Sequence, residues 1–494
     1  MDRIVGTPGN QVSDTTSREL EEVLLAASAA QRVFGVSDVR QRASFLEAIA
    51  VALEQDLPGL VDTAQRETAL GHARLEYEVR RSSEQFRLMA RVIQDGMWLG
   101  CVIDHAHETP LGPSQDLRVM NRPLGPVLVF GAANFPLASS VPGSDTASAL
   151  AAGCVVVAKV HPGHPETCAR SAQLIQNAAQ RSGFPSEVLS IIAGLDAGRE
   201  AATSPHIAAI GFTGSRHGGK LLGDLCAQRE APIPFFGELG AVNPVVITEA
   251  ALKDRGAEIA NAFVANVTRG SGQFCTKPGL CFIPNSELGN CFIRDVGNEV
   301  AKLGSLPLLN THIAENFDAG KSRLEQLIVN SNGSIMKHGE AIIGVVALEA
   351  AMQASTTPLF EEYFGPSSLL ITYDDLEQIW PLVTSLDGSL AFSIFVQPEE
   401  GDAAHLLSLA TSKAGRVLVN EFGPGTSVSW SMHHGGPFPS ASDPRTSSMG
   451  ASSIQRWLRP VAFQNVPDHL LPPELQEANP LSIPRRVDEV LQQP

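Results

Sequence analysis

The sequence predicts an α/β protein with parallel, doubly wound sheets covered by helices and divided into more than one domain. Short apolar runs alternate with helical stretches from residue 123 onward, which is typical of buried parallel strands. A glycine-rich turn follows one of these runs. The chain has 494 residues, and single cores stop growing at about 250–300 residues, so we expect two or three domains.

The first segment of the chain, residues 17–98, is expected to be helical. Residues 21–27 and 45–50 carry apolar side chains at three- and four-residue spacing, as amphipathic helices do. Residues 101–122 lose that period and gain proline and glycine. We therefore expect either an exposed hairpin or a linker there.

Four apolar runs then predict buried strands, at residues 127–130, 155–158, 208–212 and 244–247. Helical stretches lie between them, for example at residues 146–152 and 166–181. A regular alternation of buried strands and helices predicts a parallel sheet with helices on both faces.

The alternation resumes after Cys275 and predicts a second α/β domain. Helical stretches are expected near residues 288–303 and 321–329, and strands near 369–373 and 390–396. The proline-rich tail, residues 467–494, is expected to pack on a surface or on another subunit.

Charge and cysteine content exclude several classes of partner and site. A net charge of −17 argues against nucleic acid or an anionic membrane as partner. Seven irregularly spaced cysteines favour reduced thiols and a cytoplasmic location, and they lack the spacing of a zinc site, so no metal is expected. Met1–Gly6 has no signal-peptide character. No apolar run reaches the roughly 18 residues that span a bilayer.

Cys275 and Glu238 are the candidate reactive groups. Cys275 follows a glycine-bracketed turn, Gly270-Ser271-Gly272-Gln273-Phe274, where a thiolate could act as a nucleophile. Glu238 lies between glycines in an apolar stretch, which predicts a turn and a raised pKa suited to a general base. The alternatives are a buried structural cysteine and a capping or ion-paired glutamate.

Ser215, Lys159 and Asn134 each follow a predicted strand, where ligands of open α/β sheets bind. Ser215 follows a glycine turn and should open a helix whose free N–H groups suit a pyrophosphate, although the GxGxxG fingerprint is absent. Lys159 could bond ribose or phosphate, and the Asn134 amide could stabilise an oxyanion. The alternatives are an ordinary strand-to-helix turn, a solvated lysine and a turn asparagine.

Together, these motifs resemble the aldehyde dehydrogenase superfamily over nearly the whole chain. The resemblance implies that Cys275 is the nucleophile, that Glu238 is the general base, and that Asn134 with the Cys275 N–H forms the oxyanion hole. It also implies the residues that bind the nicotinamide cofactor, NADP or NAD: Lys159, Gly214, Ser215, Gly219, Glu362 and Phe364.

The same resemblance implies an aldehyde dehydrogenase-like fold with a Rossmann-type cofactor domain, an α/β catalytic domain and an oligomerisation arm. Residues 1–100 and 123–243 would form the cofactor domain and residues 244–455 the catalytic domain. Residues 101–122 and 456–494 would form the arm and tail of a homodimer, or of a tetramer.

Finer motifs resemble the subgroup of α-ketoglutaric semialdehyde (2,5-dioxopentanoate) dehydrogenases. They include residues 67–71, 143–150, 232–236 and 434–439. The implied reaction is NAD(P)-dependent oxidation of a small aldehyde through a cysteine thiohemiacetal and thioester, with 2,5-dioxopentanoate as the expected substrate. The alternatives are an NADP-dependent fatty or general aldehyde dehydrogenase, a cysteine (thio)esterase, and a non-catalytic dinucleotide-binding protein.

Two positions depart from the family pattern. Pro162 stands where relatives often carry a glutamate that repels a 2′-phosphate, so NADP is expected to be accepted. Arg269 stands six residues before Cys275, where relatives are usually apolar and line the substrate tunnel. With Phe274 beside it, Arg269 could pair with a substrate carboxylate, or alternatively face solvent or a neighbouring acid.

Overall fold

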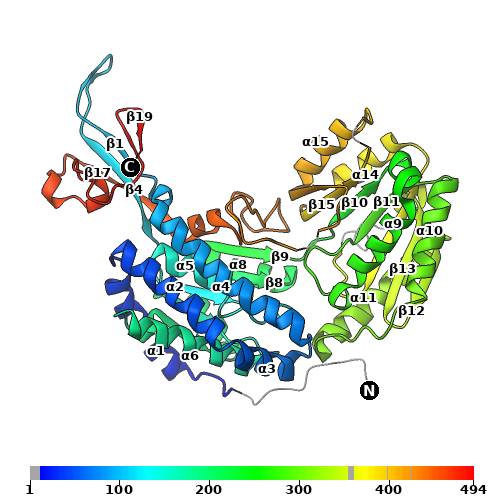
Figure 1. The fold of residues 1–494 in the computed structure, drawn as a ribbon, viewed down its shortest axis with the longest axis horizontal. Helices are drawn as coiled ribbons and strands as arrows, with labels where there is room; N and C mark the ends of the chain where they lie inside the picture. The colour runs from blue at the N-terminus through cyan, green and yellow to red at the C-terminus, as the bar shows by residue number, and fades with distance from the viewer. Residues whose placement is uncertain (1–11, 354–360, 398, 424, 494) are drawn as a thin grey trace.

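The computed structural model describes residues 12–353, 361–397, 399–423 and 425–493. Met1–Gly6, on which the expectation about a signal peptide depends, lies outside the described residues. Two large α/β lobes face each other across the molecule, and an arm projects from the first lobe (Figure 1). Within the described residues, no helix is both long and apolar enough to cross a bilayer.

Four helices form the N-terminal segment and cover one face of the first lobe (Figure 1). The first begins at a capping box, in which the Thr16 side chain accepts from the Glu19 N–H and the Glu19 carboxylate accepts from the Thr16 N–H. Their buried faces contribute the apolar side chains expected from the three- and four-residue spacing. The helices are α1 (Ser17–Phe34), α2 (Val39–Gln55), α3 (Leu57–Thr68) and α4 (His72–Asp95).

The first sheet has five parallel strands in the order β7-β6-β5-β8-β9. The strands are β5 (Val127–Phe130), β6 (Val156–Lys159), β7 (Leu189–Ile192), β8 (Ala209–Gly214) and β9 (Phe235–Leu239). The connecting helices are α5 (Ser144–Ala152), α6 (Pro165–Arg181), α7 (Leu195–Thr203) and α8 (Arg216–Gln228). The strand order reverses at β5, and such switch points form ligand crevices at the carboxyl ends of the strands.

The second sheet has seven strands in the order β12-β13-β14-β11-β10-β15-β16, all parallel except β12. The strands are β10 (Pro244–Ile247), β11 (Leu280–Pro284), β12 (Ser334–His338), β13 (Ala341–Ala347), β14 (Ser367–Tyr373), β15 (Ser389–Phe395) and β16 (Ala414–Val419). Two apolar clusters cover its faces. The helices are α9 (Glu249–Thr268), α10 (Glu287–Val300), α11 (Thr311–Asn330), α12 (Leu348–Gln353), α14 (Trp380–Ser385) and α15 (Ala403–Lys413).

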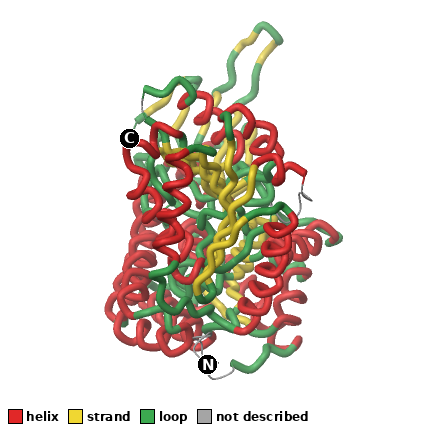
Figure 2. The backbone as a smooth tube through the Cα atoms, turned by 90° about the vertical axis from the view of Figure 1, so that its right-hand side faces the viewer, coloured by secondary structure: helices red, strands yellow, loops and turns green. Residues whose placement is uncertain are grey.

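The arm is a third sheet that joins residues 102–123 with the C-terminal residues 458–492, in the order β17-β4-β1-β18-β19. Its strands are β1 (Val102–Asp104), β4 (Leu117–Pro123), β17 (Leu458–Gln464), β18 (Arg485–Val487) and β19 (Val490–Gln492). A hairpin, β2 (Glu108–Thr109) and β3 (Gly112–Pro113), projects beyond the body of the molecule (Figure 2). The hairpin alternative for residues 101–122 is therefore correct, and the tail packs on the arm of its own chain.

The predicted α/β fold with parallel sheets is confirmed, with element bounds that differ by a few residues from expectation. The strand expected at 155–158 is β6, which ends at Lys159, and the helix expected at 321–329 is the longer α11. Strands such as β7 and β16 were not anticipated because Ser190 in the first and Gly415-Arg416 in the second interrupt their apolar runs. We propose that the three sheets correspond to the cofactor domain, the catalytic domain and the arm.

Candidate active site

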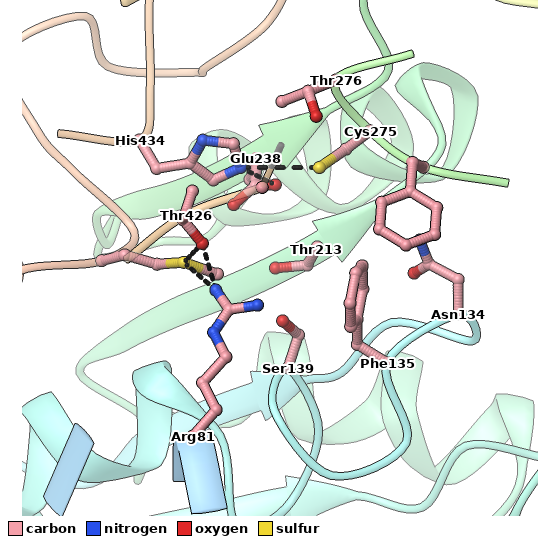
Figure 3. A pocket seen from close by; sticks show the side chains of 13 residues that line it. Arg81, Asn134, Phe135, Ser139, Thr213, Glu238, Cys275, Thr276, Thr426 and His434 are labelled. Carbon is pink, nitrogen blue, oxygen red and sulfur yellow. Dashed lines mark hydrogen bonds and ion pairs between the residues drawn. The ribbon is translucent and has the colours of Figure 1, made fainter. Parts of the chain in front are cut away.

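A cavity lies between the two lobes, at the carboxyl-terminal edge of the first sheet (Figure 3). Its walls come from segments far apart in the chain: α4, the loop after β5, β8, β9, the turn before β11, and the loop between β16 and β17. The lining residues are Arg81, Asn134, Phe135, Ser139, Thr213, Glu238, Phe274, Cys275, Thr276, Gly425, Thr426, His434 and Met449.

Cys275 lies on the turn that the sequence predicted. Gly270, Ser271 and Gly272 have φ values of +53°, +57° and +70°, a left-handed path that the two glycines adopt without strain and that is uncommon for a residue such as Ser271. A side chain at Gly272 would clash with the backbone of Gly365, so this turn lies directly against the segment that leads into β14. The amide of Asn243 donates to the Cys275 carbonyl at 2.8 Å, which holds the cysteine backbone in place.

The surroundings of Cys275 favour the neutral thiol over the thiolate. Burial raises the pKa of this thiol well above its ordinary value, and the nearby carboxylates of Glu238 and Glu362 raise it further. The guanidinium groups of Arg81 and Arg416 act in the opposite direction. A nucleophilic cysteine in this position therefore needs a neighbouring group that accepts its proton.

Glu238 is buried in the cavity wall, within strand β9 and not on the turn that the glycines around it suggested. The Ser448 hydroxyl donates to Oε2, and His434 Nε2 lies 2.9 Å from Oε1. Burial raises the pKa of the Glu238 carboxyl, but His434 and the Ser448 hydrogen bond lower it more, and the net pKa falls below the ordinary value. The expected rise in pKa is therefore wrong, because the sequence did not reveal the basic partner.

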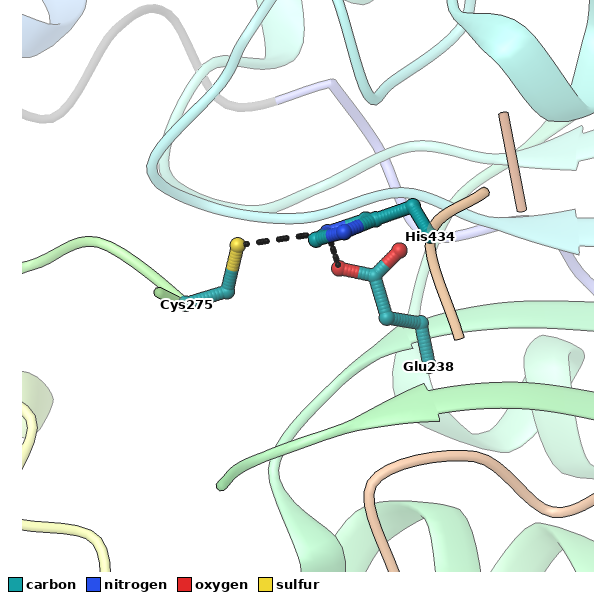
Figure 4. A group of neighbouring side chains, drawn as sticks. All are labelled: Glu238, Cys275 and His434. Atoms are coloured by element: carbon teal, nitrogen blue, oxygen red, sulfur yellow. Dashed lines mark hydrogen bonds and ion pairs between the residues drawn. The ribbon is translucent and has the colours of Figure 1, made fainter. Parts of the chain in front are cut away.

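That partner, His434, is a candidate functional residue that sequence reasoning missed. Its Nε2 lies 3.5 Å from the Cys275 sulfur as well as 2.9 Å from Glu238 Oε1, so it stands between the two groups (Figure 4). The ring is buried, and its Nδ1 has no hydrogen-bond partner among the described residues. One carboxylate oxygen of Glu238, the sulfur of Cys275 and one ring nitrogen of His434 lie within 4.8 Å of one another. When the ring hydrogen is on Nδ1, Nε2 can accept a proton from the thiol, and the resulting Nε2–H can then donate to the Glu238 carboxylate.

Asn134 reaches the cavity from the loop after β5, and its side chain is buried there. Its Nδ2 donates to the Gln273 carbonyl at 2.8 Å, two residues before Cys275. The guanidinium of Arg74 donates to the Asn134 backbone carbonyl. The amide carries two hydrogens, and the Gln273 bond uses only one of them, so the other can serve an oxyanion next to Cys275.

The expected phosphate- and ribose-binding residues lie at one edge of the first sheet. Ser215 is the N-cap of α8, where its hydroxyl accepts from the Gly218 N–H at 3.2 Å. Lys159 ends β6, on the other side of β5. Gly214 ends β8, and a side chain at Gly219 would clash with Leu239 of β9. A helix N-terminus beside the switch point of a parallel sheet fits the pyrophosphate of a dinucleotide.

Glu362 brings a carboxylate from the second lobe to this same edge. It packs on Gly240, just after β9, where any larger residue would clash with its carboxylate. Burial raises the pKa of Glu362 to about 7, while burial lowers the pKa of Lys277 to about 8. Phe364 follows on the same half-buried segment. The Glu362 carboxylate is suited to accept hydrogen bonds from the hydroxyls of a nicotinamide riboside, and Phe364 is suited to contact its ring.

Aromatic and guanidinium groups surround the outer part of the cavity. Phe135 and Phe274 meet edge to face, with ring centroids 5.2 Å apart. The guanidinium of Arg269 lies 5.7 Å from the Phe274 ring. Phe274 lines the cavity and Arg269 does not, so the structure places Arg269 behind the aromatic wall and not at the thiol.

Comparisons with known proteins agree on one family. A model of the aldehyde dehydrogenase family matches residues 2–459. An alpha-ketoglutaric semialdehyde dehydrogenase 2 from Azospirillum brasilense is 40% identical, covering 95% of this chain and 91% of its own. An alpha-ketoglutaric semialdehyde dehydrogenase from Acinetobacter baylyi is 38% identical, covering 98% of this chain and 94% of its own.

Solved structures share the fold at lower identity. The bifunctional proline utilization A protein superposes with a TM-score of 0.78 and 21% identity, covering 92% of this chain and 46% of that chain. The glyceraldehyde-3-phosphate dehydrogenase GapN from Methanocaldococcus jannaschii, solved with NADP, has a TM-score of 0.73 and 19% identity, covering 94% and 98%.

Proposed function

Because the chain belongs to the aldehyde dehydrogenase family and is an NAD(P)-dependent oxidoreductase of aldehydes, we propose that it oxidises 2,5-dioxopentanoate, α-ketoglutaric semialdehyde, to the dicarboxylic acid. The observation that carries the substrate is the likeness, at 38–40% identity over almost the full chain, to two enzymes named for it. The chain carries a net charge of −17, so guanidinium groups gathered near one cavity stand out from the rest of the molecule. The guanidinium groups of Arg81 and Arg269 near this cavity therefore support an anionic substrate.

Acylation begins at the Cys275 thiol. We propose that His434 starts as the tautomer with its hydrogen on Nδ1, so that Nε2 accepts the proton from Sγ, 3.5 Å away. The new Nε2–H then donates to the Glu238 carboxylate, which stabilises the imidazolium. A bond then forms between Sγ and the aldehyde carbon, giving a thiohemiacetal whose oxyanion accepts from the Asn134 amide and the Cys275 N–H. The nicotinamide ring supplies the acceptor for the hydride that leaves this carbon, and a thioester on Cys275 remains.

Deacylation needs a base that is ionised near neutral pH. The lowered pKa of Glu238 keeps its carboxylate ionised there, and it lines the same cavity as Cys275. We propose that Glu238 takes a proton from water as the water oxygen attacks the thioester carbon. The carbon–sulfur bond breaks, the acid leaves, and the proton held by Glu238 returns the sulfur to the thiol. The proton that His434 took during acylation passes to solvent, which restores the neutral imidazole.

We propose that Lys159, Ser215, Gly214, Gly219, Glu362 and Phe364 hold the cofactor. The exposed Pro162 offers neither a carboxylate that would repel a 2′-phosphate nor a donor that would bind one. Both NADP and NAD are therefore proposed as cofactors.

One experiment tests this function and separates it from its alternatives. Initial rates are measured with 2,5-dioxopentanoate, short neutral aldehydes and long-chain aldehydes, each with NAD, NADP and no cofactor. The proposal expects the highest kcat/KM for 2,5-dioxopentanoate. Preference for a long-chain aldehyde would instead favour a fatty aldehyde dehydrogenase, and ester or thioester hydrolysis without cofactor as the main activity would favour a hydrolase.

Cofactor affinity is expected to depend on the ionisation of Glu362. Its pKa of about 7 means that the carboxyl is neutral below that pH and ionised above it. The ionised form accepts stronger hydrogen bonds from ribose hydroxyls, so the KM for the cofactor should fall as pH rises from about 6 to 8. Steady-state kinetics across this range should show the fall in the wild type but not in Glu362→Gln. The same pH dependence in both enzymes would contradict the assignment.

Arg269 is proposed to attract the acid end of the substrate from behind Phe274. It lies outside the cavity lining and is only half-buried, so its effect should be long-range and screened by salt. Arg269→Leu should lower kcat/KM for 2,5-dioxopentanoate roughly 3- to 10-fold at low ionic strength and less at high salt. An equal loss with neutral pentanal, or no loss with either substrate, would contradict this role.

The arm supports a homodimer, with a tetramer as the alternative. The hairpin projects beyond the body of the molecule (Figure 2), and its Leu111 is fully exposed. We propose that this projecting arm contacts a second copy of the chain. All seven cysteines are free, which fits the proposed cytoplasmic location. Light scattering of the purified enzyme measures the oligomeric state directly.

A further inference from the structure

Helix α4 presents two arginines to the active-site cavity, and only one of them has an acidic partner among the described residues. Arg74 and Arg81 are separated by seven residues, so they lie on the same helix face, and each guanidinium stacks on the Phe135 ring, at 5.0 and 5.8 Å. Arg74 is paired with Glu78, one turn away, at 3.3 Å. Arg81 lies beyond that pair, on the cavity side.

Arg81 is a buried cation without a counter-charge in the described ranges of the chain. Only 7% of the residue is exposed. Its guanidinium donates to the Thr426 hydroxyl and contacts the Met449 sulfur at 3.0 Å, and both partners are neutral. Across the part of the chain that the structure describes, its Nε has no hydrogen-bond partner and no carboxylate forms an ion pair with it. Holding a guanidinium in this state is costly unless something else supplies the anion.

The guanidinium is directed into the cavity that holds the reactive thiol. Figure 3 shows Arg81 rising from the wall opposite Cys275, with its head group among the hydroxyls of Ser139, Thr213 and Thr426. A planar guanidinium binds a carboxylate through two parallel hydrogen bonds, and the hydroxyls of Ser139 and Thr213 offer donors to a neighbouring carbonyl, whereas the Thr426 hydroxyl already donates to the Met449 sulfur.

We propose that Arg81 is the residue that binds the carboxylate of the substrate, with the surrounding hydroxyls contacting the adjacent 2-oxo group. The aldehyde end then lies at Cys275 and the acid end at the opposite wall. This inference rests on the proposed oxidation of an aldehyde acid, and it assigns the direct contact to Arg81, leaving to Arg269 the longer-range attraction described above. Arg81 thereby determines specificity for short 2-oxo aldehyde acids over neutral aldehydes.

The test compares two substrates of equal length, 2,5-dioxopentanoate and pentanal, in four enzymes: wild type, Arg81→Met, Arg81→Lys and Arg80→Met. Arg80 is the matched control, because it is the neighbouring arginine on α4 but its side chain is 68% exposed. The readout is the ratio of the two kcat/KM values, which cancels any general effect on the thiol. Arg81→Met should lower this ratio roughly 100-fold, since a buried charged hydrogen-bond pair is lost. Arg81→Lys should lower it less, and Arg80→Met should leave it unchanged.

Inhibition by the product 2-oxoglutarate supplies a second readout that does not need turnover of the acid substrate. With pentanal as substrate, the inhibition constant of 2-oxoglutarate should rise by a similar factor in Arg81→Met and stay unchanged in Arg80→Met. An unchanged substrate ratio and inhibition constant in Arg81→Met would overturn the proposal. If the wild type itself shows no preference for the aldehyde acid, the proposed substrate fails first, and the two failures are thereby distinguished.

Discussion

Replacing Cys275 with alanine is expected to lower kcat/KM for aldehyde oxidation at least about 10⁴-fold, because no other group among the described cavity-lining residues can form the thioester. The described cavity-lining residues include two sulfur atoms. The Cys275 thiol can become acylated, whereas the Met449 sulfur is a thioether and cannot. Stopped-flow measurement of reduced cofactor at equal enzyme and substrate concentrations should show no burst in Cys275→Ala.

Two further variants make this prediction specific. Cys275→Ser keeps the shape of the side chain but replaces the thiol with a much weaker nucleophile, so its activity should also fall by several orders of magnitude. Cys291→Ala, which changes a half-buried cysteine on α10 outside the cavity lining, should retain wild-type rates. Full turnover in Cys275→Ser would exclude the covalent mechanism.

Replacing His434 with asparagine is expected to lower kcat/KM about 10²- to 10³-fold at neutral pH, the usual contribution of a general base. Without Nε2, the Cys275 proton loses its acceptor at 3.5 Å, and burial together with the carboxylates holds the thiol pKa well above its ordinary value. The reaction then depends on the small fraction of thiolate present. Activity of His434→Asn should therefore rise steeply with pH, by up to about tenfold per pH unit, as the thiol ionises.

The matched control is His433→Asn, since His433 is the adjacent histidine but does not line the cavity. Its pH profile and kcat should remain those of the wild type. Glu238 provides an independent check. The pKa of its carboxyl should rise in His434→Asn, because the group that lowers it most is gone while burial remains. A His434→Asn enzyme with near wild-type rates and an unchanged pH profile would show that His434 takes no part in proton transfer.

Short-range patterns in the sequence were enough to predict the fold class and many of its elements. The run at residues 127–130 coincides with β5, and that at residues 244–247 with β10, because an apolar run bounded by turn residues specifies a buried strand locally. Ser215 opens α8 as expected, because an N-cap depends on only a few consecutive residues. Four strands of the second lobe, β11, β12, β13 and β16, were missed, because long-range pairing decides whether such segments become strands.

The candidate site likewise contains residues that the sequence predicted and residues that it did not. Cys275, Glu238 and Asn134 stand in local motifs that the sequence displays, so the resemblance to a family could assign roles to them from residue order alone. His434 belongs to a motif that the sequence also displays, but no local pattern connects it to Cys275, from which it is 159 residues away. Arg81 is 345 residues from the threonine whose hydroxyl it contacts.

The sequence by itself therefore determined the α/β class, the nucleophile motif and the family, because each depends on neighbouring residues or on a recognisable order of motifs. The tertiary structure alone decided that the Glu238 carboxylate is paired with a histidine, which reversed the expected direction of its pKa shift. It also decided which arginine faces the thiol across the cavity. Charge interactions fall off with distance and strengthen with burial, and both quantities exist only once distant segments of the chain have packed together.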